Sequence, residues 1–228
     1  MEDLLKRNVG GVEVAIRRAT PDLRVARSCL VEGEFDSLKG ILPSLKHNFI
    51  IDAGGYIGTA AIALSRLYPD ATVVSVEASS SNFAVLSRNV SAFPRIVPLN
   101  MALVGTKRVL RLKNRGTGEW GYTTIEAPRD NPDATTMEMV EGITVSEIIS
   151  MHEKTGVDIV KIDIEGGEID VLDNSEGWMA SASVVLVELH ERIIRGCKKS
   201  FSNATHGRRE VRIGKEKIAS ISPTISEN

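Results

Sequence analysis

The sequence has little of what marks several classes of protein. It contains only two cysteines, Cys29 and Cys197, without a CxxC pair, so neither a disulfide scaffold nor a cysteine metal site is expected. No apolar run reaches the roughly 20 residues that a membrane span needs, and the first residues lack the hydrophobic stretch of a signal peptide. A formal net charge of −2 gives no basic excess for nucleic acid. We therefore expect a cytoplasmic protein with free thiols and with neither a membrane nor a nucleic acid as partner.

What the sequence does have is the balance of a single globular domain. Its 228 residues, 42% of them hydrophobic and 25% charged, are enough to bury a core without disulfides or metal. Short apolar runs alternate with segments whose apolar residues recur at helical spacing. This alternation is typical of an α/β fold with a mostly parallel sheet and helices on both faces. Strands are predicted over 48–54, 71–77, 95–100, 157–165 and 182–190, and helices over 57–68, 79–89, 144–154 and 167–174.

The middle and the ends of the chain depart from this rhythm. Residues 107–113 alternate like an exposed strand, and residues 207–222 predict two strands joined by a turn at Gly214, which form an antiparallel hairpin at the sheet edge. Residues 114–142 are rich in Gly, Pro, Asp, Asn, Thr and Glu, which predicts a long functional loop or a disordered one. The expected organisation is an N-terminal extension over 1–34, a main domain over 35–222 that opens with a helix over 35–45, and a tail over 223–228.

The segment IDAGGYIG, residues 51–58, runs from a predicted strand into a predicted helix. A backbone that turns so tightly needs glycine, since a positive φ and a close approach to a ligand both exclude a Cβ atom. The helix N-terminus that follows presents unpaired N–H groups to a carboxylate or a phosphate. Glu77 ends the next strand, about 20 residues beyond the last glycine, where folds of this kind place the acid that binds a ribose. The segment therefore predicts a nucleotide-like cofactor site.

Two cofactors fit such a loop, and charge separates them. Ala53, Gly55 and Gly58 match the dinucleotide pattern G-x-G-x-x-G with alanine in first place, which is a weak match. Asp52 stands at the lip of the loop, and the loop contains no lysine or arginine, so a pyrophosphate would be repelled there. S-adenosylmethionine carries a sulfonium and an ammonium, which acids at strand ends suit. We favour S-adenosylmethionine as the cofactor. The alternatives are an NAD(P)-dependent oxidoreductase and a non-catalytic module that binds S-adenosylmethionine.

Four motifs together resemble the FkbM family of methyltransferases. They are IDAGGYIG at 51–58, VEASSSNFAVLSRN at 76–89, DIVKIDIEGGEIDVL at 158–172 and VVLVELH at 184–190, preceded by GEF at 33–35. The most specific part is KIDIEGGE at 161–168. Tyr56, Ala78 and Ser146 stand where the family usually has asparagine, proline and an acid. The resemblance implies a seven-stranded sheet that ends in an edge hairpin, S-adenosylmethionine as methyl donor, and usually O-methylation of a small molecule or a sugar.

Polar residues at the ends of the later strands form a second set. Ligands of open parallel sheets bind beyond the carboxyl ends of the strands, and Asp163, Glu165 and His190 fall there. His190 is the candidate general base, because the unperturbed pKa of histidine lies near neutrality. Asp163 is expected to face the methionine end of the cofactor. Glu165, which alternates with Asp163 along the strand, is expected to position substrate or cap the next helix. A divalent metal on these three residues has no firm ligand spacing to support it, and we predict none.

The acceptor is expected to be a small molecule or a sugar, and the long middle segment is expected to recognise it. Trp120 and Tyr122 give that segment surface to bury on a ligand, which predicts a substrate lid over 114–142 that orders when cofactor and acceptor are bound. The residues predicted to bind the cofactor are Asp52, Ala53, Gly54, Gly55, Tyr56, Ile57, Gly58, Glu77, Ala78, Met101, Ala102 and Asp163.

Overall fold

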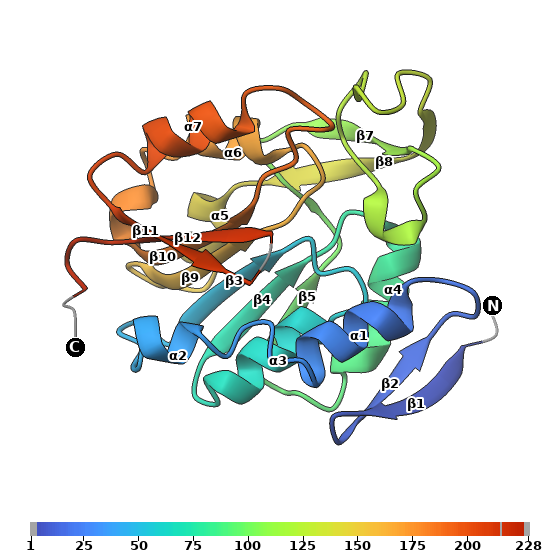
Figure 1. Cartoon of the computed structure of the whole chain (residues 1–228), viewed down its shortest axis with the longest axis horizontal. Helices are drawn as coiled ribbons and strands as arrows, with labels where there is room; N and C mark the ends of the chain where they lie inside the picture. Colours follow the sequence, from blue (N-terminus) through green and yellow to red (C-terminus); the bar gives the residue numbers. More distant parts are fainter. Residues whose placement is uncertain (1–3, 215, 226–228) are drawn as a thin grey trace.

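The fold is built on one large sheet with helices on both faces (Figure 1). The computed structural model describes residues 4–214 and 216–225 of the chain. The strands of the large sheet are β3 (Phe49–Ala53), β4 (Thr72–Val76), β5 (Ile96–Leu99), β9 (Val157–Ile162), β10 (Ala182–Glu188), β11 (Arg209–Ile213) and β12 (Lys217–Ile221). Among the described residues these seven strands lie in the order β11-β12-β10-β9-β3-β4-β5. The strands from β10 to β5 pair in parallel, whereas β11 and β12 form an antiparallel hairpin at the edge. The predicted fold class is confirmed.

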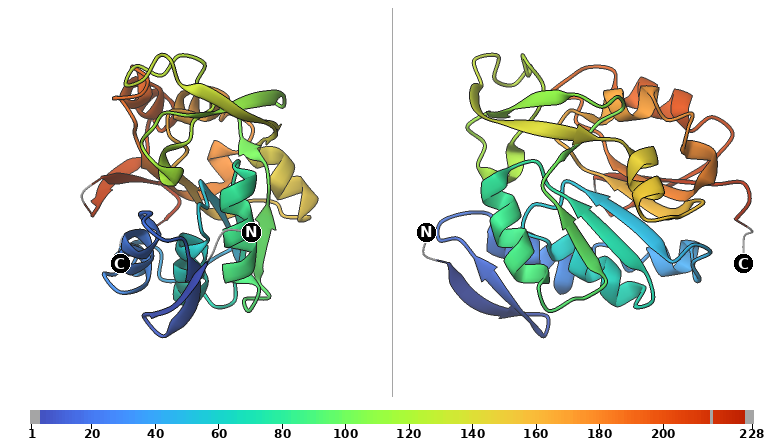
Figure 2. Two further views of the ribbon diagram at one scale, coloured as in Figure 1. Left: turned by 90° about the vertical axis from the view of Figure 1, so that its right-hand side faces the viewer. Right: turned by 180° about the vertical axis from the view of Figure 1, so that it is seen from behind.

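The central strands are apolar along their whole length because both faces of the sheet are covered. β3 is fully buried, and its side chains alternate between two core clusters. Ile50 packs on one face, and Phe49 and Ile51 pack on the other. None of the described helices combines the length and the hydrophobicity that a membrane span requires. The first face carries α1 (Asp22–Leu30), α2 (Leu38–Ile41), α3 (Thr59–Leu67) and α4 (Ser80–Val90), and the second carries α5 (Val145–Met151), α6 (Glu168–Asp173) and α7 (Cys197–Ala204) (Figure 2).

The N-terminal segment predicted as an extension packs on the domain. β1 (Leu5–Val9) and β2 (Val12–Ile16) form an antiparallel hairpin, and both strands and α1 contribute side chains to the core cluster of α3. Asn89 of α4 fixes this hairpin, because its side chain accepts from the N–H of Ala15 at 2.6 Å and donates to the Ala15 carbonyl at 3.0 Å.

Other parts of the N-terminal and C-terminal segments differ from the sequence prediction or lie outside it. The helix predicted over 35–45 is the single turn α2. Residues 1–3 of the predicted extension and residues 226–228 of the predicted tail lie outside the described residues.

The middle segment is more regular than its composition indicates. β7 (Val109–Asn114) and β8 (Thr135–Ile143) pair antiparallel, and β6 (Ala102–Leu103) joins β8 to complete a second sheet. The prediction that residues 114–142 lack regular structure is therefore wrong for the part within β8. The first half of β8 is largely exposed, including Met137 and Met139, so its sequence shows no clean alternation of buried and exposed residues. Between β7 and β8 the chain forms one short turn of 3₁₀ helix over Glu119–Gly121.

Candidate active site

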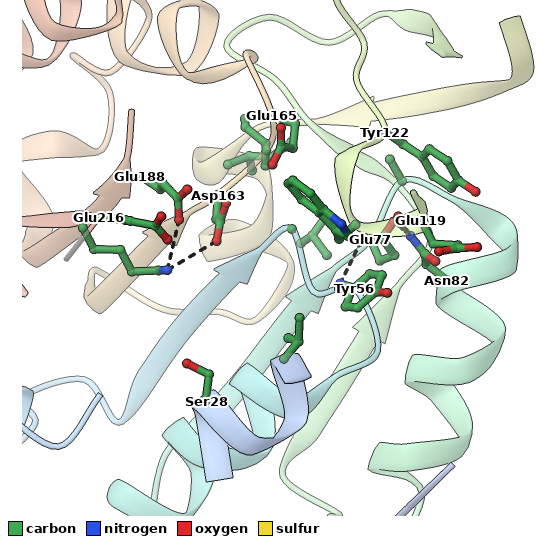
Figure 3. A pocket seen from close by; sticks show the side chains of 18 of the residues that line it. Ser28, Tyr56, Glu77, Asn82, Glu119, Tyr122, Asp163, Glu165, Glu188 and Glu216 are labelled. Atoms are coloured by element: carbon green, nitrogen blue, oxygen red, sulfur yellow. Dashed lines mark hydrogen bonds and ion pairs between the residues drawn. The ribbon is translucent and has the colours of Figure 1, made fainter. Parts of the chain in front are cut away.

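A cavity opens at the carboxyl ends of β3, β4, β9 and β10 (Figure 3). Its volume is about 970 Å³, and pockets of about 300–1,000 Å³ are usual for small-molecule ligands. Its position is the one expected for an open parallel sheet. Of the residues predicted to bind the cofactor, those that line the cavity are Gly54, Tyr56, Glu77, Ala78, Met101, Ala102 and Asp163. The others are buried at the end of β3 or within the loop that follows it and do not line the cavity; they are Asp52, Ala53, Gly55, Ile57 and Gly58.

The tight turn after β3 is required by contacts within the protein. Gly54 has a φ of +78°, and a Cβ atom there would lie 1.8 Å from the carbonyl oxygen of Asp163. A Cβ atom on Gly55 would lie 2.4 Å from Ser75 Oγ. The N–H groups of Gly54 and Gly55 both donate to the Val76 carbonyl at 3.0 Å. Glycine at these positions lets the ends of β3, β4 and β9 converge, and the turn forms the floor of the cavity.

Asp52 lies beneath the loop, not at its lip as the sequence predicts. Its side chain is fully buried, Oδ1 pairs with Lys161 Nζ at 2.9 Å, and Oδ2 accepts from the Ser75 hydroxyl at 2.9 Å. Lys161 also donates to the carbonyls of Ala53 and Gly54 at 3.3 and 3.2 Å. A lysine from the neighbouring strand β9 therefore supports the loop, which the linear sequence of the loop does not show. Asp52 therefore anchors the loop from below, and its predicted contact with the cofactor stays a prediction.

Glu77 follows β4 and lines the cavity while only 7% of the residue is exposed. Its carboxylate accepts from the backbone N–H groups of Tyr56 at 2.8 Å and Ser79 at 2.9 Å, and from the Asn82 side chain at 3.4 Å. Burial raises the pKa of Glu77 to about 7, and these donors offset the effect only in part. Ser79 and Asn82 both donate to Oε1, whereas Oε2 accepts only from Tyr56. Oε2 therefore keeps room for one further hydrogen bond, which suits a hydroxyl of a ribose.

Tyr56, a departure from the FkbM pattern, is held by a network from the N-terminal segment. Its φ of +50° lies where asparagine is tolerated better than most residues, which gives a physical reason for the usual asparagine. The Tyr56 hydroxyl donates to the buried carboxylate of Asp22, which Arg17 also binds at 2.9 Å. Arg17 in turn donates to Asn82 at 2.7 Å, and Asn82 contacts Glu77. Residues before the predicted domain therefore help to shape the cavity.

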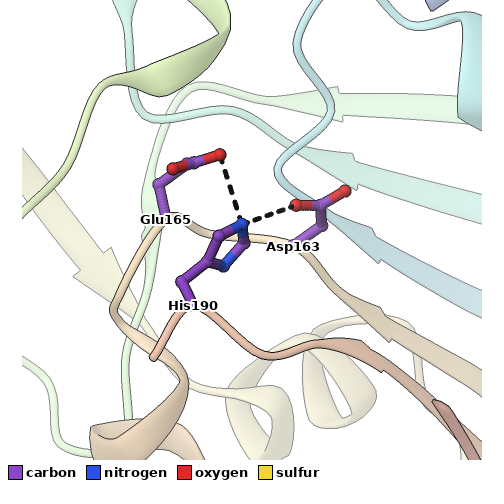
Figure 4. A group of neighbouring side chains, drawn as sticks. All are labelled: Asp163, Glu165 and His190. Carbon is purple, nitrogen blue, oxygen red and sulfur yellow. Dashed lines mark ion pairs between the residues drawn. The ribbon is translucent and has the colours of Figure 1, made fainter. Parts of the chain in front are cut away.

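Asp163, Glu165 and His190 converge on one point beyond β9 and β10 (Figure 4). The strand predicted to reach Glu165 ends at Ile162, and Glu165 adopts a φ of +51°. One atom that can bind a metal from each of the three residues lies within 4.8 Å of the others. The strand alternation expected for the two acids is not seen, because the chain leaves the sheet before it reaches them.

His190 is enclosed by carboxylates and is not among the residues that line the cavity. Its Nδ1 lies 2.7 Å from Glu168 Oε1. Its Nε2 lies 3.3 Å from both Glu165 Oε1 and Glu188 Oε1, and 3.8 Å from Asp163 Oδ1. Burial alone would lower the pKa of His190, but the carboxylates outweigh it and raise the pKa to about 12. His190 does not line the cavity, so its position lends no support to the predicted role as general base, which stays a prediction.

The middle segment is attached to this cluster through Glu165. Arg115, whose side chain is fully buried, pairs with Glu165 Oε2, and Arg192 donates to the same oxygen at 3.0 Å. Trp120 and Tyr122 of the segment line the cavity. The segment thus borders both the acidic cluster and the cavity, and its behaviour as a lid stays a prediction.

Sequence reasoning misses the partners that hold the predicted residues. Lys161 and Glu168 lie within the specific motif KIDIEGGE, which is the signal that points to them. Glu188 ends β10 and follows from the same strand-end argument as His190. Arg115 lies 50 positions from Glu165 in the sequence and has no local signal, so only the folded chain reveals it.

The open α/β sheet with its edge hairpin, the glycine turn beneath the cavity and the acid at the end of β4 define the class I architecture of S-adenosylmethionine-dependent methyltransferases. The family described as the methyltransferase FkbM domain matches residues 52–206, and the chain belongs to this family. The protein is therefore a methyltransferase that uses S-adenosylmethionine. The oxidoreductase and the non-catalytic binding module weighed from the sequence are set aside.

The relatives that match this chain in sequence are distant. Hexuronic acid methyltransferase AglP of Haloferax volcanii is 26% identical over 163 residues, which cover 70% of this chain and 64% of that protein. Methyltransferase sdnD of Sordaria araneosa is 27% identical over 182 residues, which cover 64% of this chain and 67% of that protein. The chain therefore spans about two thirds of the length of these relatives.

Solved structures also resemble the chain. An O-methyltransferase from Bacillus cereus in complex with SAH has a TM-score of 0.47 at 16% identity, and the match covers 88% of each chain. M. jannaschii TYW2 in complex with AdoMet has a TM-score of 0.47 at 11% identity, and the match covers 97% of this chain and 86% of that chain.

Proposed function

We propose that the protein transfers a methyl group from S-adenosylmethionine to a hydroxyl group of a small molecule or a sugar. The observation that carries this proposal is the continuity of the cavity, which reaches from Glu77 to the carboxylates of Asp163 and Glu165 and to the ring of Trp120. One end suits a nucleoside, and the other offers proton acceptors and an aromatic surface. The name of the Haloferax volcanii relative, a hexuronic acid methyltransferase, supports a sugar as acceptor.

The residues around the cavity fit S-adenosylmethionine. Glu77 would accept a hydrogen bond from a ribose hydroxyl. Ala78, Met101 and Ala102 line the cavity as well and offer apolar surface to the adenine. Asp163, at the end of β9, offers a carboxylate to the positively charged methionine end. When bound, S-adenosylmethionine supplies an electrophilic methyl group.

Methyl transfer to a hydroxyl is an in-line displacement that also releases one proton. The acceptor oxygen forms a bond to the methyl carbon while the carbon–sulfur bond breaks and its electron pair goes to sulfur. The products are a methyl ether and S-adenosylhomocysteine. The side chain of Asp163 is 25% exposed and lines the cavity, whereas His190 does not line it, so we assign the acceptance of the hydroxyl proton to Asp163. Orientation of the hydroxyl by the cavity supplies much of the rate.

One exposed arginine beside an aromatic ring supports an acidic acceptor, although the lining residues as a whole carry more carboxylates than cations. Arg24, Arg192 and Lys217 line the cavity. The Arg192 side chain is 47% exposed, and its guanidinium lies 6.0 Å from the centre of the Trp120 ring. A guanidinium beside an aromatic ring suits a sugar acid, because the carboxylate pairs with the cation while the ring packs on the apolar face of the sugar. We therefore propose a hexuronic acid, or a sugar that carries one, as the acceptor to test first.

Transfer of a labelled methyl group from S-adenosylmethionine to matched acidic and neutral sugars tests this proposal. We expect label in a uronic acid and not in its neutral counterpart. Asp163→Asn should lower kcat by about a hundredfold or more, the usual contribution of a positioned base. Arg192→Gln should raise KM for the acidic sugar with less effect on kcat, whereas Arg195→Gln, an exposed arginine that is not among the lining residues, should change neither. Label found only on amine acceptors would contradict O-methylation.

A further inference from the structure

Three side chains that can bind a metal meet at the cavity end where we place the acceptor. An oxygen of Asp163, an oxygen of Glu165 and Nε2 of His190 lie within 4.8 Å of one another (Figure 4). Two carboxylates and one imidazole suit Mg²⁺, Mn²⁺ and similar divalent cations. Acidic clusters also occur without any metal, so the evidence for a metal site depends on the arrangement of the histidine.

His190 points an unpartnered nitrogen into this cluster. The residue is 1% exposed, and its Nε2 has no hydrogen-bond partner in the described part of the chain. Its other ring nitrogen, Nδ1, lies 2.7 Å from the buried carboxylate of Glu168. Histidines that bind metals commonly donate their second N–H to a carboxylate, which fixes the ring and leaves Nε2 as the ligand atom. His190 and Glu168 have this arrangement.

The two carboxylates are oriented in a similar way. Arg115 and Arg192 both bind Oε2 of Glu165, so Oε1 is the oxygen that lies 3.3 Å from His190 Nε2. Asp163 turns one oxygen toward two lysines and the other, Oδ1, toward Nε2 at 3.8 Å. Each of the three side chains is therefore anchored by one polar atom and presents the other to the same point.

We propose that Asp163, Glu165 and His190 bind a divalent metal ion. With metal–ligand bonds of about 2.1 Å, neighbouring ligand atoms of an octahedral site lie about 3.0 Å apart. The observed separations from Nε2 are 3.3 and 3.8 Å, and the two carboxylate oxygens lie within 4.8 Å of each other, so the side chains would draw together around an ion. No linear ligand spacing shows this site in the sequence, because the ends of β9 and β10 come together only in the fold.

Some neighbouring charges would repel a cation at this site, and others would attract one. Lys161 and Lys217 lie 3.9 and 3.7 Å from Asp163 Oδ2, and both repel a cation. Glu188 Oε1, 3.3 Å from His190 Nε2, attracts one. The lysines contact the oxygen of Asp163 that faces away from the cluster, so they leave the ligand atoms accessible.

The site adjoins the acceptor if the proposed O-methylation holds, on which this step rests. Asp163 and Glu165 line the cavity, whereas His190 does not, so an ion held by the three residues would be open to the cavity. A divalent cation stabilises a deprotonated oxygen beside it. The same position suits an acceptor with two adjacent oxygens, as in a vicinal diol or a hydroxy acid.

Binding of Mn²⁺, a paramagnetic probe, tests the site without reference to catalysis. The full chain is treated with EDTA, freed of chelator and titrated with Mn²⁺ under electron paramagnetic resonance. We expect one site per chain, with electron spin echo modulation from a coordinated imidazole nitrogen. Asp163→Asn and Glu165→Gln should each weaken binding about tenfold or more. The matched control is Glu32→Gln, which removes an exposed carboxylate from the same cavity outside the cluster and should bind Mn²⁺ like the wild type.

Three results would overturn the metal site: no Mn²⁺ bound to the wild type, binding without nitrogen modulation, or binding unchanged in both cluster variants. Circular dichroism checks that each variant is folded, and the nitrogen signal is measured on the wild type alone. Methyl transfer is measured separately. A chain that binds Mn²⁺ through nitrogen but methylates no hydroxyl contradicts the proposed function and leaves the metal site standing. Full O-methylation activity in a chain that binds no Mn²⁺ contradicts the metal site and leaves the proposed function standing.

Discussion

Glu77 links the pH of the solution to cofactor binding. Burial raises the pKa of Glu77 to about 7, and its ionised form is the better acceptor for a ribose hydroxyl. The apparent affinity should therefore follow the ionised fraction and rise roughly tenfold between about pH 6 and pH 8. Calorimetry with S-adenosylhomocysteine across this range checks the rise. Glu77→Gln has no charge to titrate and should give a flat profile, and a flat profile in the wild type would place the ribose elsewhere.

The same pKa determines how Glu77 affects the stability of the free protein. An unfolded glutamate has a pKa near 4.5, whereas folded Glu77 has a pKa of about 7. Between these values the folded form binds more protons than the unfolded form, so the free energy of unfolding falls as the pH rises. Urea denaturation at about pH 5 and pH 7 should show this loss, and the loss should be smaller in Glu77→Gln. An equal loss in both proteins would assign it to other groups.

Removal of the Glu77 carboxylate should weaken the cofactor complex directly. Glu77→Ala leaves a ribose hydroxyl unpaired, and we expect a loss of roughly 1.5–3 kcal/mol in the binding of S-adenosylhomocysteine, as for a hydrogen bond to a charged group. The control is Glu119→Ala, which removes another carboxylate that lines the cavity but keeps the backbone carbonyl that Asn82 binds. A similar loss in both variants would mean that general charge, and not ribose contact, explains the effect.

Asp52 should matter for folding more than for ligand contact. Its carboxylate and Lys161 form a fully buried ion pair at 2.9 Å. Asp52→Ala leaves the lysine uncompensated, which costs about 3–5 kcal/mol in a buried pair. Urea denaturation measures the cost, and Asp70→Ala, at an exposed position, should stay within about 0.5 kcal/mol of the wild type. Equal stability of Asp52→Ala and the wild type would contradict the anchoring role.

The candidate site could be located from the sequence because acids and a histidine stand where predicted strands end. Glu77 and Asp163 line the cavity as that argument requires. The roles of the individual side chains could not be predicted from the sequence, because these roles depend on partners that are distant in sequence. Asp52 faces Lys161 from another strand, and His190 is surrounded by carboxylates that no local pattern assigns to it.

The segment between β7 and β8 is the element whose function is most open to test. It attaches to Glu165 through Arg115 and places Trp120 and Tyr122 at the cavity. Replacing residues 116–134 with a short Gly-Ser linker should leave the affinity for S-adenosylhomocysteine within about threefold and abolish methyl transfer, because closure over the acceptor excludes water. Hydrogen exchange in this segment should slow when S-adenosylhomocysteine and the acceptor are added together. Unchanged turnover after the replacement would show that the segment is not a lid.

Strands that are buried on both faces could be predicted from the sequence, whereas partly exposed strands and helices could not. The central strands read as apolar runs because helices cover both faces of the sheet. β8 presents two exposed methionines and one exposed glutamate, and the N-terminal hairpin and α1 carry many charged residues, so their patterns are weak. Tertiary contacts, such as those of Asn89 with β2, stabilise these elements without leaving a periodic signal.

Across the whole molecule, a ligand that binds only the folded chain raises the stability of that chain. At a concentration of about 100 times its Kd, such a ligand adds about 2.7 kcal/mol, which for a protein of this size raises Tm by roughly 5–10 °C. Thermal unfolding with S-adenosylhomocysteine and, in parallel, with NAD⁺ tests directly whether the cavity beside Glu77 and Gly54 binds S-adenosylmethionine. We expect a clear rise in Tm with S-adenosylhomocysteine, a smaller one in Glu77→Ala at the same concentration, and none with NAD⁺. A rise with NAD⁺ alone, or an undiminished rise in Glu77→Ala, would contradict binding of S-adenosylmethionine in this cavity.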